Sequence, residues 1–144
     1  DQAMTYRVGF DICDEALPDV DAAVAFLDEL PTIIFPHGGR AAAYWFAPAG
    51  VSDDVLRVDL DFDTGRAALR WLPDGTHGVE LAPDGSIVVM ESSDCPVVTV
   101  PADLARVSVD TATRAVVEYV TTGQRPTGVD WAPDAADAPP AQRP

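Results

Sequence analysis

The stretch RVDLDFDTG, residues 57–65, has a pattern that could belong to a calcium-binding loop or to a β-strand. Which of the two it forms decides the fold. Its acids occupy every second position: Asp59, Asp61 and Asp63. A calcium-binding EF-hand loop has oxygen ligands at its first, third and fifth positions, glycine at the sixth and glutamate at the twelfth. Here Thr64 stands where that glycine is required, and Arg70 puts a cation where calcium needs a carboxylate. The pattern therefore argues against a cation site.

The same residues fit a half-buried β-strand, in which polar and apolar side chains alternate between two faces. Val58, Leu60 and Phe62 separate the acids. We therefore predict a strand over residues 55–62. Cross-strand pairs with arginines of the next strand would neutralise part of its outer, solvated face, which carries Arg57, Asp59, Asp61 and Asp63.

Turn signals after this strand predict an antiparallel meander. The triplet Pro-Asp-Gly occurs at residues 73–75 and 83–85, where proline presets one turn dihedral and glycine accepts a positive φ. The second turn is expected to pair residues 78–81 with 86–90. The predicted strands cover residues 5–10, 32–35, 41–47, 55–62, 67–72, 78–81, 86–90, 97–100 and 128–131.

Two segments have helical spacing. In the first, Pro18 suits the opening turn and Pro31 ends the helix, whose apolar face consists of Val20, Ala23, Val24, Leu27 and Leu30. The second covers residues 109–122, with Asp110 as the N-cap and Gly123 as the C-cap. Its apolar face consists of Ala112, Ala115, Val116, Tyr119 and Val120. We predict the fold class α+β, an antiparallel β-sheet meander with an N-terminal and a C-terminal helix packed on it.

Length and composition favour one domain. The chain has 144 residues, of which 47% are hydrophobic. We expect residues 1–132 to form a single α+β domain and residues 133–144, rich in Pro, Ala and Asp, to form a disordered tail. No signal peptide or membrane-length apolar run is visible, so we expect a cytoplasmic protein. Cys13 and Cys95 are then expected to be buried reduced thiols, although a disulfide between them stays open.

Charge restricts the partners. Asp and Glu total 24 against nine arginines and no lysine, which gives a net charge of −15. Such a field repels nucleic acid and anionic membranes, so we expect neither as a partner. It speeds the approach of basic proteins, but it also keeps a protein soluble, and the charge alone does not separate these two roles.

Catalytic motifs are lacking. His37 and His77 fall in predicted turns, where exposure or turn packing is expected, and neither has a second His, Cys or Glu at zinc-ligand spacing. We predict no catalytic residue, no metal, no cofactor and no enzymatic activity. Two alternatives stay open, a small hydrolytic enzyme that uses acids and a generic acidic adaptor domain for a basic partner.

Tryptophans are expected mainly in the core. Trp71 and Trp131 fall in predicted strands, where tryptophan usually packs with its N–H bonded. Trp45, in the sequence AAAYWFA, has apolar neighbours on both faces of its strand. We therefore expect a helix to cover one face and a partner protein to cover the other.

The C-terminal sequence AVVEYVTTGQRPTGVDW, residues 115–131, resembles the ending of the first-numbered immunity-protein family of bacterial polymorphic toxin systems (Imm1). That ending is an amphipathic helix, a T-G-x-R-P-T segment and a short strand that closes on tryptophan. The matching residues are Thr122, Gly123, Arg125, Pro126, Thr127, Val129 and Trp131. Gly123 would end the helix, Pro126 would fix the turn and Trp131 would anchor the strand, so these residues and Arg125 are expected to be scaffold.

The resemblance implies a small α+β protein of the producing cell's cytoplasm that binds and blocks the toxic domain of a secreted effector. Neighbours of the family often include nucleic-acid deaminase toxins, and nucleases also occur. We expect a one-to-one complex in which a row of carboxylates occupies the basic groove of the toxin. The interface candidates are Tyr44, Trp45, Asp53, Asp54, Asp59, Asp61, Asp63, Asp74, Asp84, Glu91 and Asp94.

Overall fold

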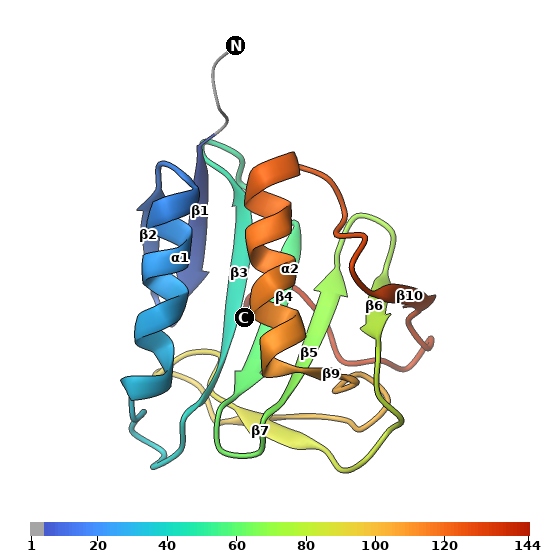
Figure 1. Ribbon diagram of the computed structural model, residues 1–144. Coiled ribbons are helices and arrows are strands. Elements are labelled where there is room, and N and C mark those ends of the chain that lie inside the picture. Colours follow the sequence, from blue (N-terminus) through green and yellow to red (C-terminus); the bar gives the residue numbers. More distant parts are fainter. Residues whose placement is uncertain (1–4) are drawn as a thin grey trace.

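The strand predicted at residues 55–62 forms as β4 (Leu56–Asp61), at the centre of an antiparallel sheet in the computed structural model, which describes residues 5–144. The sheet has the strand order β10-β6-β5-β4-β3-β1-β2, and the short β9 also pairs with β5. Both helices cover one face of this sheet (Figure 1). The predicted α+β class, with an N-terminal and a C-terminal helix on an antiparallel sheet, is confirmed.

The remaining elements have the following bounds. The main sheet contains β1 (Tyr6–Phe10), β2 (Cys13–Leu17), β3 (Ala41–Pro48), β5 (Arg66–Trp71), β6 (Thr76–Val79), β9 (Val107–Ser108) and β10 (Asp130–Pro133). A separate two-stranded sheet contains β7 (Ile87–Val89) and β8 (Val98–Val100). The helices are α1 (Val20–Glu29), the short 3-10 helix η1 (Leu30–Thr32) and α2 (Val109–Thr122). Neither α1 nor α2 is long and apolar enough to span a membrane, and residues 5–144 contain no other such candidate.

Side-chain caps begin both helices. The carboxylate of Asp19 accepts a hydrogen bond from the backbone N–H of Ala22 at 2.8 Å, and Ser108 Oγ accepts one from Thr111 N at 3.0 Å. The predicted N-cap Asp110 is therefore wrong, because the cap lies two residues earlier in the chain. Gly123 caps the end of α2 with φ of 72°, as predicted. A residue with a Cβ would be strained in this left-handed conformation.

The helix-facing core contains the inward side chains of β4 and its neighbours. Val58 and Leu60 are fully buried there, and Tyr6 and Trp71 both make edge-to-face contacts with Tyr119 of α2, at 5.2 and 5.5 Å between ring centroids. All five apolar residues predicted for α2 are buried. On α1 the prediction is partly wrong, because Phe26 is buried and Val24 is exposed.

The opposite face of the sheet, which we call the rear face, is also covered. It carries Trp45, Arg57, Asp59, Ala68, Arg70 and His77, all buried. Its cover consists of β7, β8, the loop around Leu104 and residues 134–144, which we call the C-terminal segment. Figure 1 shows the C-terminus ending behind the sheet, on the side away from α1 and α2. The solvated outer face predicted for β4 is therefore wrong.

Two predicted strand assignments are also wrong. Residues 32–35 form no strand, and Ile34 in that loop is 71% exposed. Residues 78–81 do not pair with 86–90: β6 pairs with β5 and β10, whereas β7 pairs with β8. After β6 the chain leaves the main sheet, because Glu80 N and Leu81 N both donate to Arg106 O.

The sequence gives no signal for β2, whose residues CDEAL lack apolar alternation. It forms because the turn through Asp11, with φ of 54°, folds it back onto β1. Cys13 on this edge strand and Cys95 are both exposed and free, so their predicted burial is wrong and no disulfide joins them.

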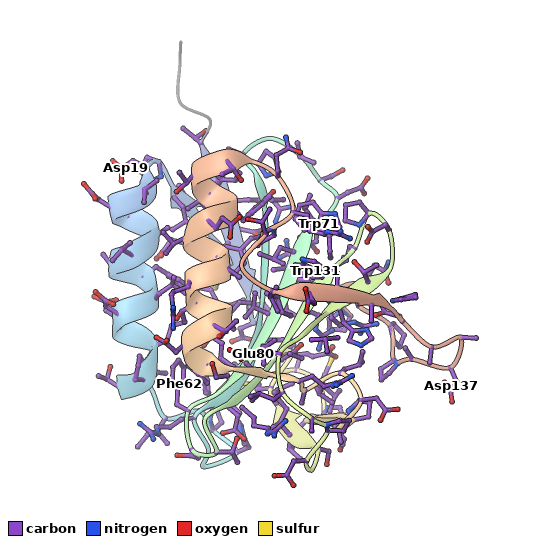
Figure 2. The ribbon with its side chains drawn as sticks, turned by 45° about the vertical axis from the view of Figure 1, so that its right-hand side comes forward. Asp19, Phe62, Trp71, Glu80, Trp131 and Asp137 are labelled. Atoms are coloured by element: carbon purple, nitrogen blue, oxygen red, sulfur yellow. The ribbon has the colours of Figure 1, made fainter. Side chains whose placement is uncertain are left out.

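The C-terminal segment follows a defined path, although the sequence predicts disorder from residue 133 onward. Asp137 lies at its outer bend, away from the helices (Figure 2). The chain then returns along the rear face, where its carbonyl groups accept hydrogen bonds from buried side chains. Such contacts use the main chain of the segment and not its side chains, so they cannot be predicted from its low hydrophobicity.

Candidate functional site

The acids of the opening stretch have separate environments. Asp59 is 0% exposed, and Asp61 is buried with its carboxylate accepting from the backbone N–H groups of Asp63 and Thr64 in the β4–β5 turn. Asp63 is exposed and pairs with Arg40 at 2.9 Å. Hydrogen bonds from the Arg40 side chain and backbone amide lower the pKa of Asp63. These three acids therefore do not form one exposed row.

Arg57 occupies the centre of the rear face, between two carboxylates. Its guanidinium contacts Asp59 at 2.9 Å and Glu91 at 2.6 Å, and it lies over the Trp45 ring at 4.9 Å from the centroid. Burial alone would lower the pKa of Arg57, but the charges and hydrogen bonds of Asp59 and Glu91 outweigh it and raise that pKa. The cluster is a buried ion triad, in which removing one partner leaves an uncompensated charge.

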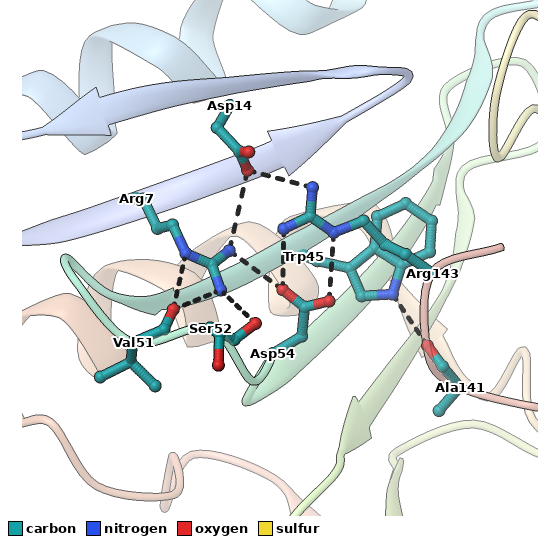
Figure 3. A network of polar contacts seen from close by, with 8 residues as sticks. All are labelled: Arg7, Asp14, Trp45, Val51, Ser52, Asp54, Ala141 and Arg143. Carbon is teal, nitrogen blue, oxygen red and sulfur yellow. Dashed lines mark hydrogen bonds and ion pairs between the residues drawn. The ribbon is translucent and has the colours of Figure 1, made fainter.

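Asp54 joins the N-terminal and C-terminal parts of the chain (Figure 3). Its carboxylate accepts from Arg7 at 3.0 Å and from two nitrogens of Arg143 at 3.1 Å. Asp14 of β2 contacts the same two arginines, at 3.8 Å for Arg7 and 3.0 Å for Arg143. Two carboxylates and two guanidinium groups therefore fix the end of the C-terminal segment to the edge of the sheet.

Tyr44 and Trp45, the aromatic interface candidates, are both buried. Tyr44 is 1% exposed and points into the helix-facing core, where burial raises the pKa of its hydroxyl. Trp45 is 0% exposed on the rear face, and its Nε1 donates to Ala141 O at 2.8 Å. In Figure 3 the Arg143 side chain lies beside the Trp45 ring. We expected a partner protein to cover this face of Trp45, but in the structure the C-terminal segment covers it.

Arg70 and His77 hold the start of the C-terminal segment. Arg70 Nη2 donates to Asp134 at 3.0 Å, Arg70 Nη1 donates to Pro139 O at 2.8 Å, and His77 Nδ1 lies 2.8 Å from the same aspartate. The prediction of a turn histidine at His77 is wrong, because it belongs to β6 and is buried. The sequence gives no signal for Asp134, which lies 57 residues away from His77.

A cavity of about 270 Å³ remains between the rear face and the C-terminal segment. Its polar lining comes from Arg57, Asp59, Arg70 and Glu91, and its apolar lining includes Val98, Val100 and Leu104. Arg70 is 5% exposed, and its Nε has no hydrogen-bond acceptor within residues 5–144. A buried donor without an acceptor costs roughly 1–3 kcal/mol, so this atom marks an incompletely filled place.

Five of the interface candidates are exposed: Asp53, Asp63, Asp74, Asp84 and Asp94. Arg125 pairs with Asp74 at 2.9 Å, and Arg66 approaches Asp84 at 3.9 Å. Asp53 and Asp94 have no ion-pair partner among the residues that the structure describes. Asp54 and Glu91 are half-buried, and both are paired as described above.

A further group of acids without ion-pair partners lies outside the meander. Residues 8–39 contain seven acids and no arginine or lysine. On α1, Asp21, Asp28 and Glu29 are exposed and have no ion-pair partner in the described part of the chain. The arginine-free run is visible in the sequence and could have located this surface, whereas the choice of the meander rested on net charge, alternating acids and turn acids.

The C-terminal motif forms a connected structure after α2. Arg125 pairs with Asp74, and its guanidinium lies 5.2 Å from the centroid of the Trp131 ring. Trp131 Nε1 donates to Pro126 O at 2.8 Å. The Glu118 carboxylate accepts from Thr127 N at 2.7 Å; desolvation opposes its ionisation, but the hydrogen bonds of Thr127 and Gly128 lower its pKa.

A comparison with known families agrees with these features. A family model described as immunity protein Imm1 matches residues 19–133, from the N-cap of α1 to the last residue of β10. No curated protein matches the chain. The family match includes both helices, the centre of the sheet and the complete motif that ends on Trp131, and it stops directly before the C-terminal segment. The chain therefore belongs to the Imm1 family of immunity proteins.

Proposed function

We propose that this immunity protein binds a cognate bacterial toxin domain that acts on nucleic acid, with a deaminase as the first candidate, and blocks its substrate groove. Membership of the Imm1 family supports a toxin as the partner. The net charge of −15 supports the class of toxin, because a domain that binds phosphates presents a basic groove. The proposed role is binding in a one-to-one complex in the cytoplasm, without catalysis.

We place the contact at the loops that border the rear face. Asp53 precedes the Asp54 cluster, and Asp84 lies beside Arg66 of β5. Asp94 belongs to the loop between β7 and β8, next to Ser93, whose N–H and hydroxyl both donate to Asp11. These exposed carboxylates replace the buried Asp59 and Asp61 as the acids that meet the toxin. The unpaired acids of α1 add to the long-range attraction.

The test is association kinetics with a candidate toxin domain taken from the genes that neighbour the gene for this chain. We expect the association rate constant to fall steeply as salt concentration rises, because steering between opposite charges is screened. Neutralising Asp53, Asp84 and Asp94 to Asn should slow association more than neutralising Asp21, Asp28 and Glu29 to their amides. Both variants remove three charges from exposed positions, so the second controls for net charge.

Equal rates for the two variants would place the contact elsewhere while leaving the family role intact. Failure of the wild-type chain to bind the toxin domain, or to protect cells that express it, would overturn the proposed function.

A further inference from the structure

The C-terminal segment binds the rear face as an extended peptide would bind a groove. Three consecutive carbonyl groups accept from three side chains of the face. Arg70 Nη1 donates to Pro139 O at 2.8 Å, Arg57 Nη1 to Pro140 O at 3.3 Å, and Trp45 Nε1 to Ala141 O at 2.8 Å. Carbonyl groups are present in every peptide, so these donors recognise an extended main chain whatever its sequence.

The segment buries little of its own surface. Pro140, Gln142 and Pro144 are exposed, and the segment contains no large aliphatic or aromatic residue. Its attachment depends on polar contacts: Asp134 at the start, the three carbonyl groups, and Arg143 near the end. Release of the segment uncovers Trp45 and the buried arginines, so it becomes favourable when an incoming peptide replaces these contacts.

The place beneath the segment is only partly filled. The cavity of about 270 Å³ lies under Pro139, Pro140 and Arg143, and a second one of about 660 Å³ borders the segment on the side of His77 and Arg106. Arg57 and Arg70 both line the first cavity, and Arg70 Nε, which is itself buried, has no acceptor within residues 5–144. An occupant that brought an oxygen into this cavity would meet the guanidinium groups of its arginine lining.

We propose that the rear face is a docking site for an extended segment of the toxin, and that residues 134–144 occupy this site until the toxin displaces them. The incoming segment offers its carbonyl groups to Trp45, Arg57 and Arg70. A Gln or Glu side chain enters the cavity, with its stem against Val98 and Leu104 and its oxygen facing the lining arginines Arg57 and Arg70. This inference rests on the proposed function, and it assigns the rear face itself, rather than only its acidic border, to the interface.

The proposal predicts how the C-terminal segment controls affinity. If only the fraction of molecules with a released segment binds, the apparent dissociation constant equals the intrinsic one divided by that fraction. Arg143→Ala removes the contacts to Asp54 and Asp14 without changing any donor of the rear face. We expect it to tighten binding of the neighbouring-gene toxin domain by about threefold or more, through a larger released fraction.

Arg114→Ala is the matched control. It also removes one positive charge from a surface ion pair, with Asp110 on α2, and thereby has the same effect on net charge. Affinity of Arg143→Ala equal to or weaker than that of Arg114→Ala would overturn the proposal, because the segment would then be a bystander or part of the interface. Absence of any complex with the wild-type chain is a different result, and it would overturn the proposed function instead.

Amide hydrogen exchange of the full chain gives a second readout that does not depend on affinity. We expect the amides of Asp134 and Ala138, which donate to Gly75 O and Ala135 O in the free protein, to exchange faster in the toxin complex, because the segment is released. Unchanged or slower exchange in the complex would show that the segment stays on the rear face and would overturn the proposal.

Discussion

At the residue scale, Arg57 is the side chain whose environment departs most from its position in the sequence pattern. It belongs to the polar side of an alternating strand, yet it is 2% exposed and lies between Asp59 and Glu91. Its neighbours on the rear face come from distant parts of the chain, with Pro140 lying 83 residues away. Burial of these charges is tolerable because each has a partner of opposite sign.

Removing one member of this triad should be costly. We expect Arg57→Met to destabilise the fold by about 3–5 kcal/mol, because Asp59 is left buried without its guanidinium partner. The double variant Arg57→Met, Asp59→Leu should recover part of that loss, since it removes the fully buried carboxylate and leaves only Glu91, at the edge of the cluster, without its partner. Urea unfolding followed by circular dichroism measures both. Arg114→Met on the exposed surface is the control, and a single Arg57 variant as stable as this control would contradict the expectation.

At the element scale, the end of α2 depends on one glycine. Gly123 has φ of 72°, so we expect Gly123→Ala to lower the free energy of unfolding by about 1 kcal/mol. Gly128→Ala is a suitable control, because an added Cβ there lies 3.5 Å from Glu118 Oε1, an ordinary contact, and its φ is not positive. The thermal unfolding midpoint of Gly123→Ala should be lower than that of Gly128→Ala. Equal midpoints would show that alanine is not strained at position 123.

The loop after α2 should make stability depend on pH. The pKa of Glu118 is lowered from its ordinary value of 4.5, so the ionised form stabilises the fold. That contribution is complete above the pKa of the unfolded chain and is lost as pH falls through the lower pKa of the folded state. We expect Glu118→Gln to be less stable than the wild type at neutral pH, and the difference to narrow below pH 4.5.

The exposed Glu29 of α1 provides the matched control for this pH dependence. It has no ion-pair partner in the described part of the chain, so Glu29→Gln should follow the wild-type stability curve across the same range. A Glu118→Gln difference that stays constant down to pH 3, well below the ordinary pKa of 4.5, would exclude the carboxylate as its source.

Local pattern predicted the elements whose neighbours in space are also neighbours in the chain. Both helices and the hairpin of β4 and β5 follow from periodicity and turn residues, since each is specified within a short stretch. β2 was missed because its position is set by the preceding turn and by pairing with β1, and its polar sequence has no strand signal. The prediction paired β7 with residues 78–81, across the nearest turn. Its true partner, β8, follows after a longer loop and has no turn signal that marks the pairing.

At the scale of the whole molecule, the candidate site was predictable only in part. Net charge and the motif ending on Trp131 identified the family and a protein partner. The strands at residues 86–90 and 97–100 were predicted, but their position over the rear face was not, because it depends on contacts between distant parts of the chain. The C-terminal segment was not predicted to join them, because it has no large aliphatic or aromatic residue. The strands and segment that cover the rear face bury Asp59 and Trp45. For this reason some of the acids chosen as interface candidates lie inside the protein.

The outer edge of the sheet at β2 has a consequence for handling the protein. No strand among residues 5–144 pairs with the far side of β2, so its main-chain groups could recruit the same edge of another molecule. Glu15 is exposed there and has no ion-pair partner among residues 5–144, and like charges keep two such edges apart. We expect the purified protein to stay clear at neutral pH and to become turbid near its isoelectric point of 4.1, as light scattering would show. Acidic storage buffers would then promote edge-to-edge aggregation, and Glu15→Val should shift its onset to higher pH.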